Sequence, residues 1–256
     1  MDAPDLRNCD CLELLSSIKD NSVDLIVVDP PYYNIVGEKW DHQWNSESEY
    51  LNWCRDWTME AFRVLKPAGC FYVWGTTKSD TFLKYKLEVL NRVPGAVYQS
   101  WIIWAYDWGG RTKKKFPRKH EDLLMYSKGE EFPFYADSVR VPYKMRKNVR
   151  QGAQNNPLGK IPTDVWVKNN HTTSKEYVGW HPTQKPIPLI ERIIRAHTSK
   201  GDVVLDFFTG SGSTVVAALR SDRKFIGCEV DLGYYSKSLV HIKKLIDKQS
   251  VINESR

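Results

Sequence analysis

The sequence predicts an α/β protein with a mostly parallel, twisted sheet flanked by helices. Three apolar runs support this prediction, at residues 23–28, 202–207 and 225–230, because each is rich in valine, isoleucine, leucine or phenylalanine. Runs of this kind are typical of strands that are buried on both faces of a parallel sheet. Segments with helical periodicity separate the runs, as the crossovers between parallel strands require.

The first half of the chain alternates strands and helices in the expected way. After the strand at 23–28, Ser46 and Glu49 form a capping-box pattern, which predicts a helix from there to about Leu65. The sequence Lys66-Pro-Ala-Gly then ends that helix. Further strands are expected at 70–74, 99–104 and 123–127, and a further helix at 79–91.

Regular periodicity is lost between residues 130 and 178 and returns afterwards. Glycine, proline, asparagine and threonine are frequent in this stretch, which is too long for an ordinary connection inside a compact domain. Beyond it we expect helices at 187–197, 212–219 and 232–248, between and after the strands at 202–207 and 225–230. The chain therefore divides into a first part at 1–130, an irregular region at 131–178 and a last part at 179–256.

The composition is that of a soluble globular protein. Of the 256 residues 41% are hydrophobic, and no stretch stays apolar over the ~18 residues that a transmembrane helix needs. The first residues lack the apolar run of a signal peptide, so we expect a cytoplasmic protein. The 5 cysteines are odd in number and form no Cys-x-x-Cys pair, so neither a disulfide framework nor a metal site is expected.

Positive charge is concentrated in one region. Residues 111–150 contain 12 lysines and arginines against 5 acidic residues, a regional net charge of +7. The rest of the chain then carries −1, so this region accounts for the whole net charge of +6. The densest part runs from Arg111 to Lys119, and the segment from Tyr143 to Lys147 continues it. A local basic patch with interleaved aromatic residues indicates a phosphate backbone as partner, although a solvated loop would show the same pattern.

A glycine-rich loop follows the expected strand at 202–207. It runs from Asp206 through Gly210 and Gly212 to Thr214, between a strand and a helix, where open α/β sheets bind ligands. A dinucleotide site would need a third glycine, but Val215 stands in that place. The carboxylate of Asp206 is unfavourable beside a phosphate and suits a ligand with an ammonium group instead.

A second acidic residue indicates the same kind of ligand. Glu229 ends the next strand, 23 residues after Asp206, and an acid at about this distance can bind ribose hydroxyls. A ligand with a cationic amino-acid end and a ribose is S-adenosylmethionine, which we expect as the cofactor. A nicotinamide-dependent oxidoreductase and an ordinary turn between strand and helix are the alternatives.

The sequence Asp29-Pro30-Pro31-Tyr32 follows the first buried strand. Its prolines lack backbone N–H donors, so that carbonyl groups, a carboxylate and an aromatic ring remain. These groups fit a flat ring with an exocyclic amino group, such as adenine or cytosine. Asp29 and the Pro30 carbonyl would accept the two amino hydrogens, and Tyr32 would stack on the base. A Pro-Pro turn that only ends the strand is the structural alternative.

Such a site predicts direct methyl transfer to the amino group. Acceptors that draw the amino hydrogens out of the ring plane localise the lone pair on nitrogen, which can then attack the methyl group of a sulfonium. A base that is paired inside duplex DNA cannot reach the site, so it must be flipped out of the helix.

With these residues identified, the chain resembles the amino-directed DNA methyltransferases of the β class, which often accompany restriction systems. The order of catalytic motif, variable region and cofactor loop is similar to that of this class. The matching elements are Asn8-Cys-Asp-Cys-Leu-Glu-Leu-Leu15, Asp29-Pro-Pro-Tyr32, His181-Pro-Thr-Gln-Lys-Pro186, Asp206 to Thr214, and Glu229. The departures from the family pattern, which are Cys9, Tyr33 and Ser213, remove no catalytic group.

The resemblance implies a Rossmann-like methyltransferase fold with a permuted motif order, and it implies residue roles. Asp29, Pro30, Pro31 and Tyr32 would be catalytic. Asp10 would contact the cofactor adenine, and Lys185 and Pro186 would line the methionine end. The full set of implied cofactor-binding residues is Asp10, Lys185, Pro186, Asp206, Phe208, Gly210, Ser211, Gly212, Thr214 and Glu229.

The resemblance also implies a substrate. The partner would be double-stranded DNA, with a target-recognition segment in the region 131–178 and a DNA-facing loop at 111–119. Aspartate rather than serine at position 29 favours adenine N6, with cytosine N4, or an RNA substrate, as the nearest alternative. Many members of the class dimerise and work beside a restriction endonuclease, while a non-catalytic nucleic-acid-binding module is a further alternative. Trp40 and Trp44 follow the catalytic motif and could wall the base pocket, but we expect them to pack in the core.

Overall fold

The computed structural model describes residues 3–108, 111–143, 156–168 and 176–254, with side chains up to residue 247. Eight strands of this part form one sheet, in the order β1-β8-β7-β2-β3-β5-β4-β6. The strands are β1 (Asp5–Arg7), β2 (Val23–Val28), β3 (Leu65–Gly75), β4 (Ala96–Ala105), β5 (His120–Lys128), β6 (Val165–Val167), β7 (Val203–Asp206) and β8 (Lys224–Cys228). The longer helices are α1 (Cys11–Ser17), α2 (Glu47–Val64), α4 (Ile187–His197), α5 (Ser213–Arg220) and α6 (Leu232–Glu254).

The sheet is mostly parallel, as predicted. Strands β1, β8, β7, β2 and β3 pair in parallel, whereas β5 runs antiparallel to both β3 and β4. Gly75 at the end of β3 therefore lies opposite Asp122 near the start of β5. The antiparallel direction of β5 thus places its start at the edge of the sheet where the parallel strands end. The candidate site described below lies at this edge.

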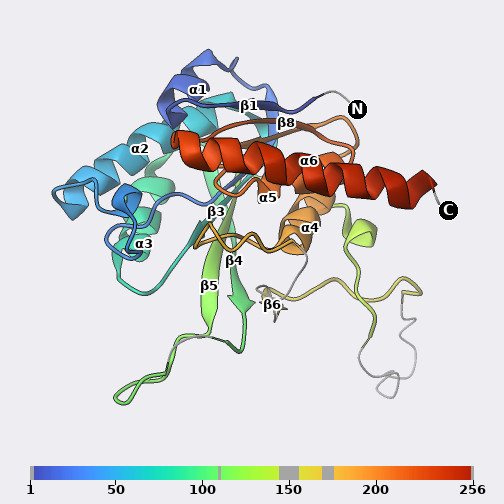
Figure 1. Cartoon of the computed structure of the whole chain (residues 1–256). Coiled ribbons are helices and arrows are strands. Elements are labelled where there is room, and N and C mark those ends of the chain that lie inside the picture. Colours follow the sequence, from blue (N-terminus) through green and yellow to red (C-terminus); the bar gives the residue numbers. More distant parts are fainter. Residues whose placement is uncertain (1–2, 109–110, 144–155, 169–175, 255–256) are drawn as a thin grey trace.

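Helices cover both faces of the sheet, as Figure 1 shows. Side chains alternate along a strand, so Ile26 and Val28 of β2 point to one face, and Leu25 and Val27 point to the other. The first face packs against α1 and α2, and the second packs against α4, α5 and α6. Burial on both faces explains why β2 has a continuous apolar sequence rather than an alternating one.

Helix α2 begins where the capping pattern predicts. Ser46 precedes its first turn, and the Ser46 hydroxyl accepts a hydrogen bond from the Glu49 N–H at 3.1 Å. The return bond goes from the Asn45 N–H to the Glu49 carboxylate at 2.9 Å, one residue earlier than in the usual capping box. The predicted β2 and α4 also have the bounds expected from the sequence.

The predicted helix at 79–91 is wrong in part. It consists of α3 (Thr81–Lys84), a π-helical turn (Tyr85–Val89) and a 3-10 turn (Leu90–Arg92). The π turn changes the helical register locally, which buries the neighbouring Val89 and Leu90 together. The Tyr85 hydroxyl also makes a buried hydrogen bond of 2.9 Å with Thr58 of α2.

Two strands, one α-helix and two 3-10 helices were not expected from the sequence. They are β1 and α1 near the N-terminus, β6 inside the irregular region, and the 3-10 helices η1 (Lys39–Asp41) and η4 (Ala136–Ser138). Strand β6 pairs in parallel with β4, so the region 131–178 contributes to the sheet, and its boundaries as a separate region remain a prediction. Among the described residues, no helix is long and apolar enough to cross a membrane.

Candidate active site

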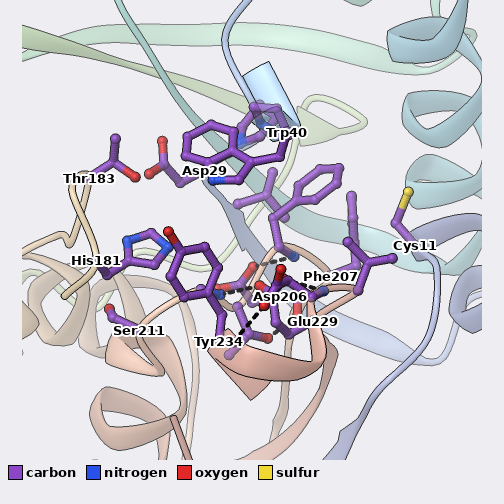
Figure 2. A pocket seen from close by; sticks show the side chains of 18 of the residues that line it. Cys11, Asp29, Trp40, His181, Thr183, Asp206, Phe207, Ser211, Glu229 and Tyr234 are labelled. Atoms are coloured by element: carbon purple, nitrogen blue, oxygen red, sulfur yellow. Dashed lines mark hydrogen bonds between the residues drawn. The ribbon is translucent and has the colours of Figure 1, made fainter. Parts of the chain in front are cut away.

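The two predicted sites lie at the same edge of the sheet. Strands β2 and β7 are parallel neighbours, with Ile26 beside Leu205. Asp29 directly follows β2 and Asp206 ends β7, so both carboxylates lie at the carboxyl edge of the sheet. Both line one pocket of 690 Å³, a size typical of small-molecule sites (Figure 2).

Most of the predicted site residues line this pocket. They are Asp10, Asp29, Pro30, Pro31, Tyr32, Lys185, Asp206, Phe208, Gly210, Ser211, Thr214 and Glu229. Pro186 and Gly212 do not line it, because they immediately precede α4 and α5 and start these helices. The fold thus brings the catalytic motif and the glycine loop together, while the role of each residue remains a prediction.

The glycine loop makes a turn in which two positions have a backbone conformation that favours glycine. Gly210 has a φ of +52° and Gly212 a φ of +83°, in the left-handed region that favours glycine. A Cβ atom at Gly210 would lie 2.6 Å from His181 Nε2, and one at Gly212 would lie 2.9 Å from Ile242 Cδ1. The two glycines therefore let the loop pass closely over His181 and Ile242.

Asp206 is a buried carboxyl group at the floor of the pocket. Its Oδ1 accepts a hydrogen bond of 3.0 Å from the Phe208 N–H. Burial raises the pKa of Asp206 to about 7, and the hydrogen bonds from Thr214 and Phe208 lower it only partly. The nearby carboxylates of Asp29 and Glu229 raise this pKa further. A cationic group in the pocket would reverse this effect and favour the ionised form of Asp206.

The two other acidic residues that were expected to bind cofactor also have partners in the protein. Glu229 accepts hydrogen bonds from the backbone N–H groups of Gly210 at 2.8 Å and Asp231 at 2.9 Å. Asp10 caps α1 by accepting from the Leu12 N–H at 2.8 Å. A carboxylate has about four acceptor positions, so both side chains keep some for a ligand.

Asp29 is held by two side chains. The Tyr32 hydroxyl donates to Asp29 Oδ1 at 2.5 Å, and the Lys185 ammonium donates to Oδ2 at 2.5 Å. Burial raises the pKa of Tyr32 well above its usual value, so the hydroxyl stays protonated and remains a donor. The Pro31 carbonyl accepts a hydrogen bond of 2.9 Å from Tyr50, which fixes the backbone of the motif.

Lys185 lies between two carboxylates. Besides Asp29, it forms an ion pair of 3.2 Å with Glu121, and its ammonium donates to the Thr183 carbonyl at 3.1 Å. Burial alone would lower the pKa of Lys185, but the charges of Asp29 and Glu121 outweigh it and raise the pKa. Lys185 is therefore positively charged. Sequence reasoning missed Glu121, for which no motif or periodicity gave a signal.

Aromatic side chains form part of the pocket wall. Trp40 lines the pocket, which corrects the expectation that it packs in the core, whereas Trp44 packs against Tyr50 and Trp53 as expected. The rings of His181 and Tyr234 lie beside each other with centroids 4.9 Å apart (Figure 2). The position of Trp40 just after the catalytic motif gave a weak signal for this wall, whereas Tyr234, in the first turn of α6, gave none.

His181 is a neutral member of this wall. Burial lowers its pKa to about 4, and its Nδ1 has no hydrogen-bond partner among the described residues. A group in the pocket could supply that partner. Within the described ranges, no cluster of three or more histidine, cysteine or acidic residues is arranged to hold a metal ion.

The basic segment from Arg111 to Lys119 belongs to the connection between β4 and β5, which projects from the body of the molecule (Figure 1). Its side chains are exposed from Arg111 to Pro117, and Phe116 is 98% exposed. At its base, the Arg118 guanidinium donates to the Thr76 hydroxyl. The segment thus begins beside the site and extends outward from it. The basic stretch from Tyr143 to Lys147 lies outside the described residues except for Tyr143.

Comparisons with known proteins agree with this geometry. The DNA methylase family matches residues 23–240. Type II methyltransferase M.HpaI of Haemophilus parainfluenzae is 36% identical over 228 residues, which cover 87% of this chain and 69% of that protein. DNA adenine methyltransferase YhdJ of Escherichia coli is 34% identical over 245 residues, which cover 90% of this chain and 79% of that protein.

Solved structures give the same fold. The cytosine-N4-specific PvuII DNA methyltransferase superposes with a TM-score of 0.75 over 96% of this chain and 91% of that chain, at 20% identity. The Rossmann-like methyltransferase fold expected from the sequence is therefore confirmed. Since the family match covers most of the chain, the oxidoreductase alternative falls away. The chain belongs to the DNA methylase family, as the order of its motifs had indicated.

Proposed function

We propose that this protein transfers a methyl group from S-adenosylmethionine to the N6 amino group of adenine in double-stranded DNA. The observation that supports this most strongly is the meeting of Asp29 and Asp206 in one pocket, at the ends of adjacent strands. One carboxylate would face the acceptor amine and the other would face the cationic end of the methyl donor. One relative in the same family, YhdJ, is named as a DNA adenine methyltransferase.

The pocket fits S-adenosylmethionine in its chemistry. Asp206 is a buried acid that has no cationic partner within the described part of the chain, and the cofactor ammonium would provide one. Glu229 keeps acceptor positions for ribose hydroxyls, and His181 offers an unpartnered ring nitrogen. A solved relative at 23% identity, M1.HpyAVI, is a complex with this cofactor. When bound, the cofactor supplies an electrophilic methyl group.

The residues of the catalytic motif would orient and polarise the flipped adenine. Asp29 and the Pro30 carbonyl would each accept one amino hydrogen, which localises the lone pair on N6. The ring of Tyr32 would stack on the base, which contributes about 1–3 kcal/mol per base. The five cysteines take no part, because the transfer needs no thiolate and burial raises the pKa of each of these thiols.

Cytosine N4 is the second candidate acceptor, favoured by the fold likeness to a cytosine-N4-specific enzyme. The two amino groups have the same local chemistry, so the motif alone does not distinguish them. Digestion of the methylated DNA to nucleosides would separate the two products. We expect N6-methyl-2′-deoxyadenosine, and N4-methyl-2′-deoxycytidine as the sole product would overturn the proposed acceptor.

We expect the affinity for S-adenosylmethionine to increase with pH. The pKa of Asp206 lies at about 7, so the carboxyl group is mostly neutral at lower pH and attracts an ammonium group weakly. Raising the pH from about 6 to about 7.5 ionises it, and the Kd should fall by about 8-fold. Calorimetric titration of the free enzyme with the cofactor at several pH values measures this change.

The matched variant for this titration is Asp206→Asn. It removes the ionisable group, so its Kd should be weaker and should stay nearly constant over the same pH range. If the wild-type Kd does not change with pH, Asp206 does not contact the ammonium end of the cofactor.

We also expect the lysines of the β4–β5 connection to bind DNA. Replacement of Lys113, Lys114 and Lys115 by alanine removes up to three phosphate contacts, so the slope of log K against log salt should flatten by up to about 3. Binding of duplex DNA at several salt concentrations, followed by fluorescence anisotropy, measures the slope. Replacement of three exposed lysines elsewhere, Lys19, Lys200 and Lys243, is the control and should leave it nearly unchanged. An unchanged slope in the first variant would place the segment away from DNA.

A further inference from the structure

Glu121 is a partly buried carboxylate beside the proposed catalytic residues, and the function proposed above does not yet account for it. We propose that Glu121 is a positioning residue for methyl transfer. By sharing the positive charge of Lys185, it leaves Asp29 able to accept the hydrogens of the target amino group. This inference rests on the proposed function and adds one residue to it.

The contacts of Lys185 form the basis of this inference. Its ammonium lies 2.5 Å from Asp29 Oδ2, 3.1 Å from the Thr183 carbonyl and 3.2 Å from Glu121 Oε2. The ammonium donates hydrogen bonds to Asp29, to the Thr183 carbonyl and, at 3.3 Å, to the Tyr32 hydroxyl. Glu121 Oε2 has no hydrogen-bond partner among the described residues, so it attracts Lys185 by its charge. The Lys185 side chain is only 4% exposed, so water screens these charges little.

The position of Glu121 follows from the antiparallel direction of β5. It is the second residue of that strand and lies at the edge where β2 and β7 end. It does not line the pocket itself, so it reaches the reacting groups only through Lys185. Glu121 is therefore placed to act on Asp29 and not on the substrate.

Charge balance explains why the second carboxylate matters. An isolated pair of Asp29 and Lys185 would be neutral, and the ammonium would compete with the target amine for the oxygens of Asp29. With Glu121 added, the three groups carry one net negative charge. Glu121 thus draws part of the ammonium charge away from Asp29, so that the oxygens of Asp29 remain better acceptors for the hydrogens of the target amino group.

The reaction itself is balanced without any further reagent. The lone pair of the amino nitrogen forms the bond to the methyl carbon, and the electrons of the broken carbon–sulfur bond stay on sulfur, which becomes a neutral thioether. The nitrogen then loses one proton, first to the carboxylate of Asp29 and then to solvent. Glu121 takes part in none of these bonds, and it only sets how strongly Lys185 holds Asp29.

The test is a double-mutant cycle with Glu121→Gln and Lys185→Met. The measured quantity is the rate of single-turnover methylation of DNA. This DNA carries a methylation site that is first mapped in cells expressing the wild-type protein. Glu121→Gln keeps the shape and removes the charge, so the single-turnover rate should fall by about 10- to 100-fold. The Kd for S-adenosylmethionine and the Kd for DNA should change by less than about 3-fold. In the Lys185→Met background, the same change should not reduce the rate further, because no ammonium then competes for Asp29.

A purely structural role for Glu121 would give another result. It would reduce the rate equally in both backgrounds, together with the stability of the protein, and that outcome would overturn the proposal. So would a Glu121→Gln variant with the wild-type rate. Glu191→Gln is the matched control, because Glu191 pairs with Arg195 and Arg220 outside the pocket and should keep full activity. A wild-type protein that methylates no DNA would instead refute the proposed function.

Discussion

Replacing Asp29 with alanine should reduce methyl transfer by about 100- to 1,000-fold, the range found when one polarising group is removed from an active site. Asp29 is the carboxylate that meets the target amine in the proposed mechanism, and the variant would leave only the Pro30 carbonyl as acceptor. The Kd for S-adenosylmethionine should change by less than about 3-fold, since the glycine loop and Glu229 are untouched. Single-turnover methylation and calorimetric titration measure the two quantities separately.

The control for this variant is Asp56→Ala, which removes an exposed carboxylate from the surface of α2 and should keep full activity. A protein that lost both methyl transfer and cofactor binding would show that Asp29 maintains the whole pocket. Methyl transfer at the wild-type rate would remove Asp29 from the mechanism. Only the combination of a lost rate and a kept Kd supports two distinct subsites.

The strands at the centre of the sheet could be predicted because burial on both faces gives them a continuous apolar sequence. Strand β2 is apolar at nearly every position, which only burial on both faces explains. The edge strands gave no such signal: in β1 only Leu6 is buried, and in β6 only Trp166. Short edge strands are stabilised by pairing with an existing sheet, which is a tertiary effect that a local pattern does not contain.

The candidate site could be predicted in the same uneven way. Asp29 and Asp206 could be found because each follows a recognisable strand and begins a loop of unusual composition. The contact between Glu121 and Lys185 could not, since it depends on β5 running antiparallel next to β3. Trp40 likewise reaches the pocket through the path of a loop, and no periodicity describes that path.

The second large effect is expected at Trp57, which links the core to the glycine loop. Trp57 lies on α2 with 0% exposure, and its ring centroid lies 5.6 Å from that of Phe207 and 5.5 Å from that of Phe208. Both phenylalanines follow Asp206 directly and begin the loop. Trp57→Ala would leave a cavity beneath the loop and should lower the free energy of unfolding by about 3–5 kcal/mol. Urea denaturation of the protein measures this change.

The same variant tests whether the core positions the cofactor site. If Phe208 moves toward the cavity, the Kd for S-adenosylmethionine should rise even in the folded fraction, because Phe208 lines the pocket. Trp57→Phe fills most of the space. It should restore much of the free energy of unfolding and much of the affinity for S-adenosylmethionine. Met59→Ala, on the exposed side of the same helix, should change the unfolding free energy by less than about 1 kcal/mol. Equal losses in Trp57→Ala and Met59→Ala would mean that α2 does not support the glycine loop.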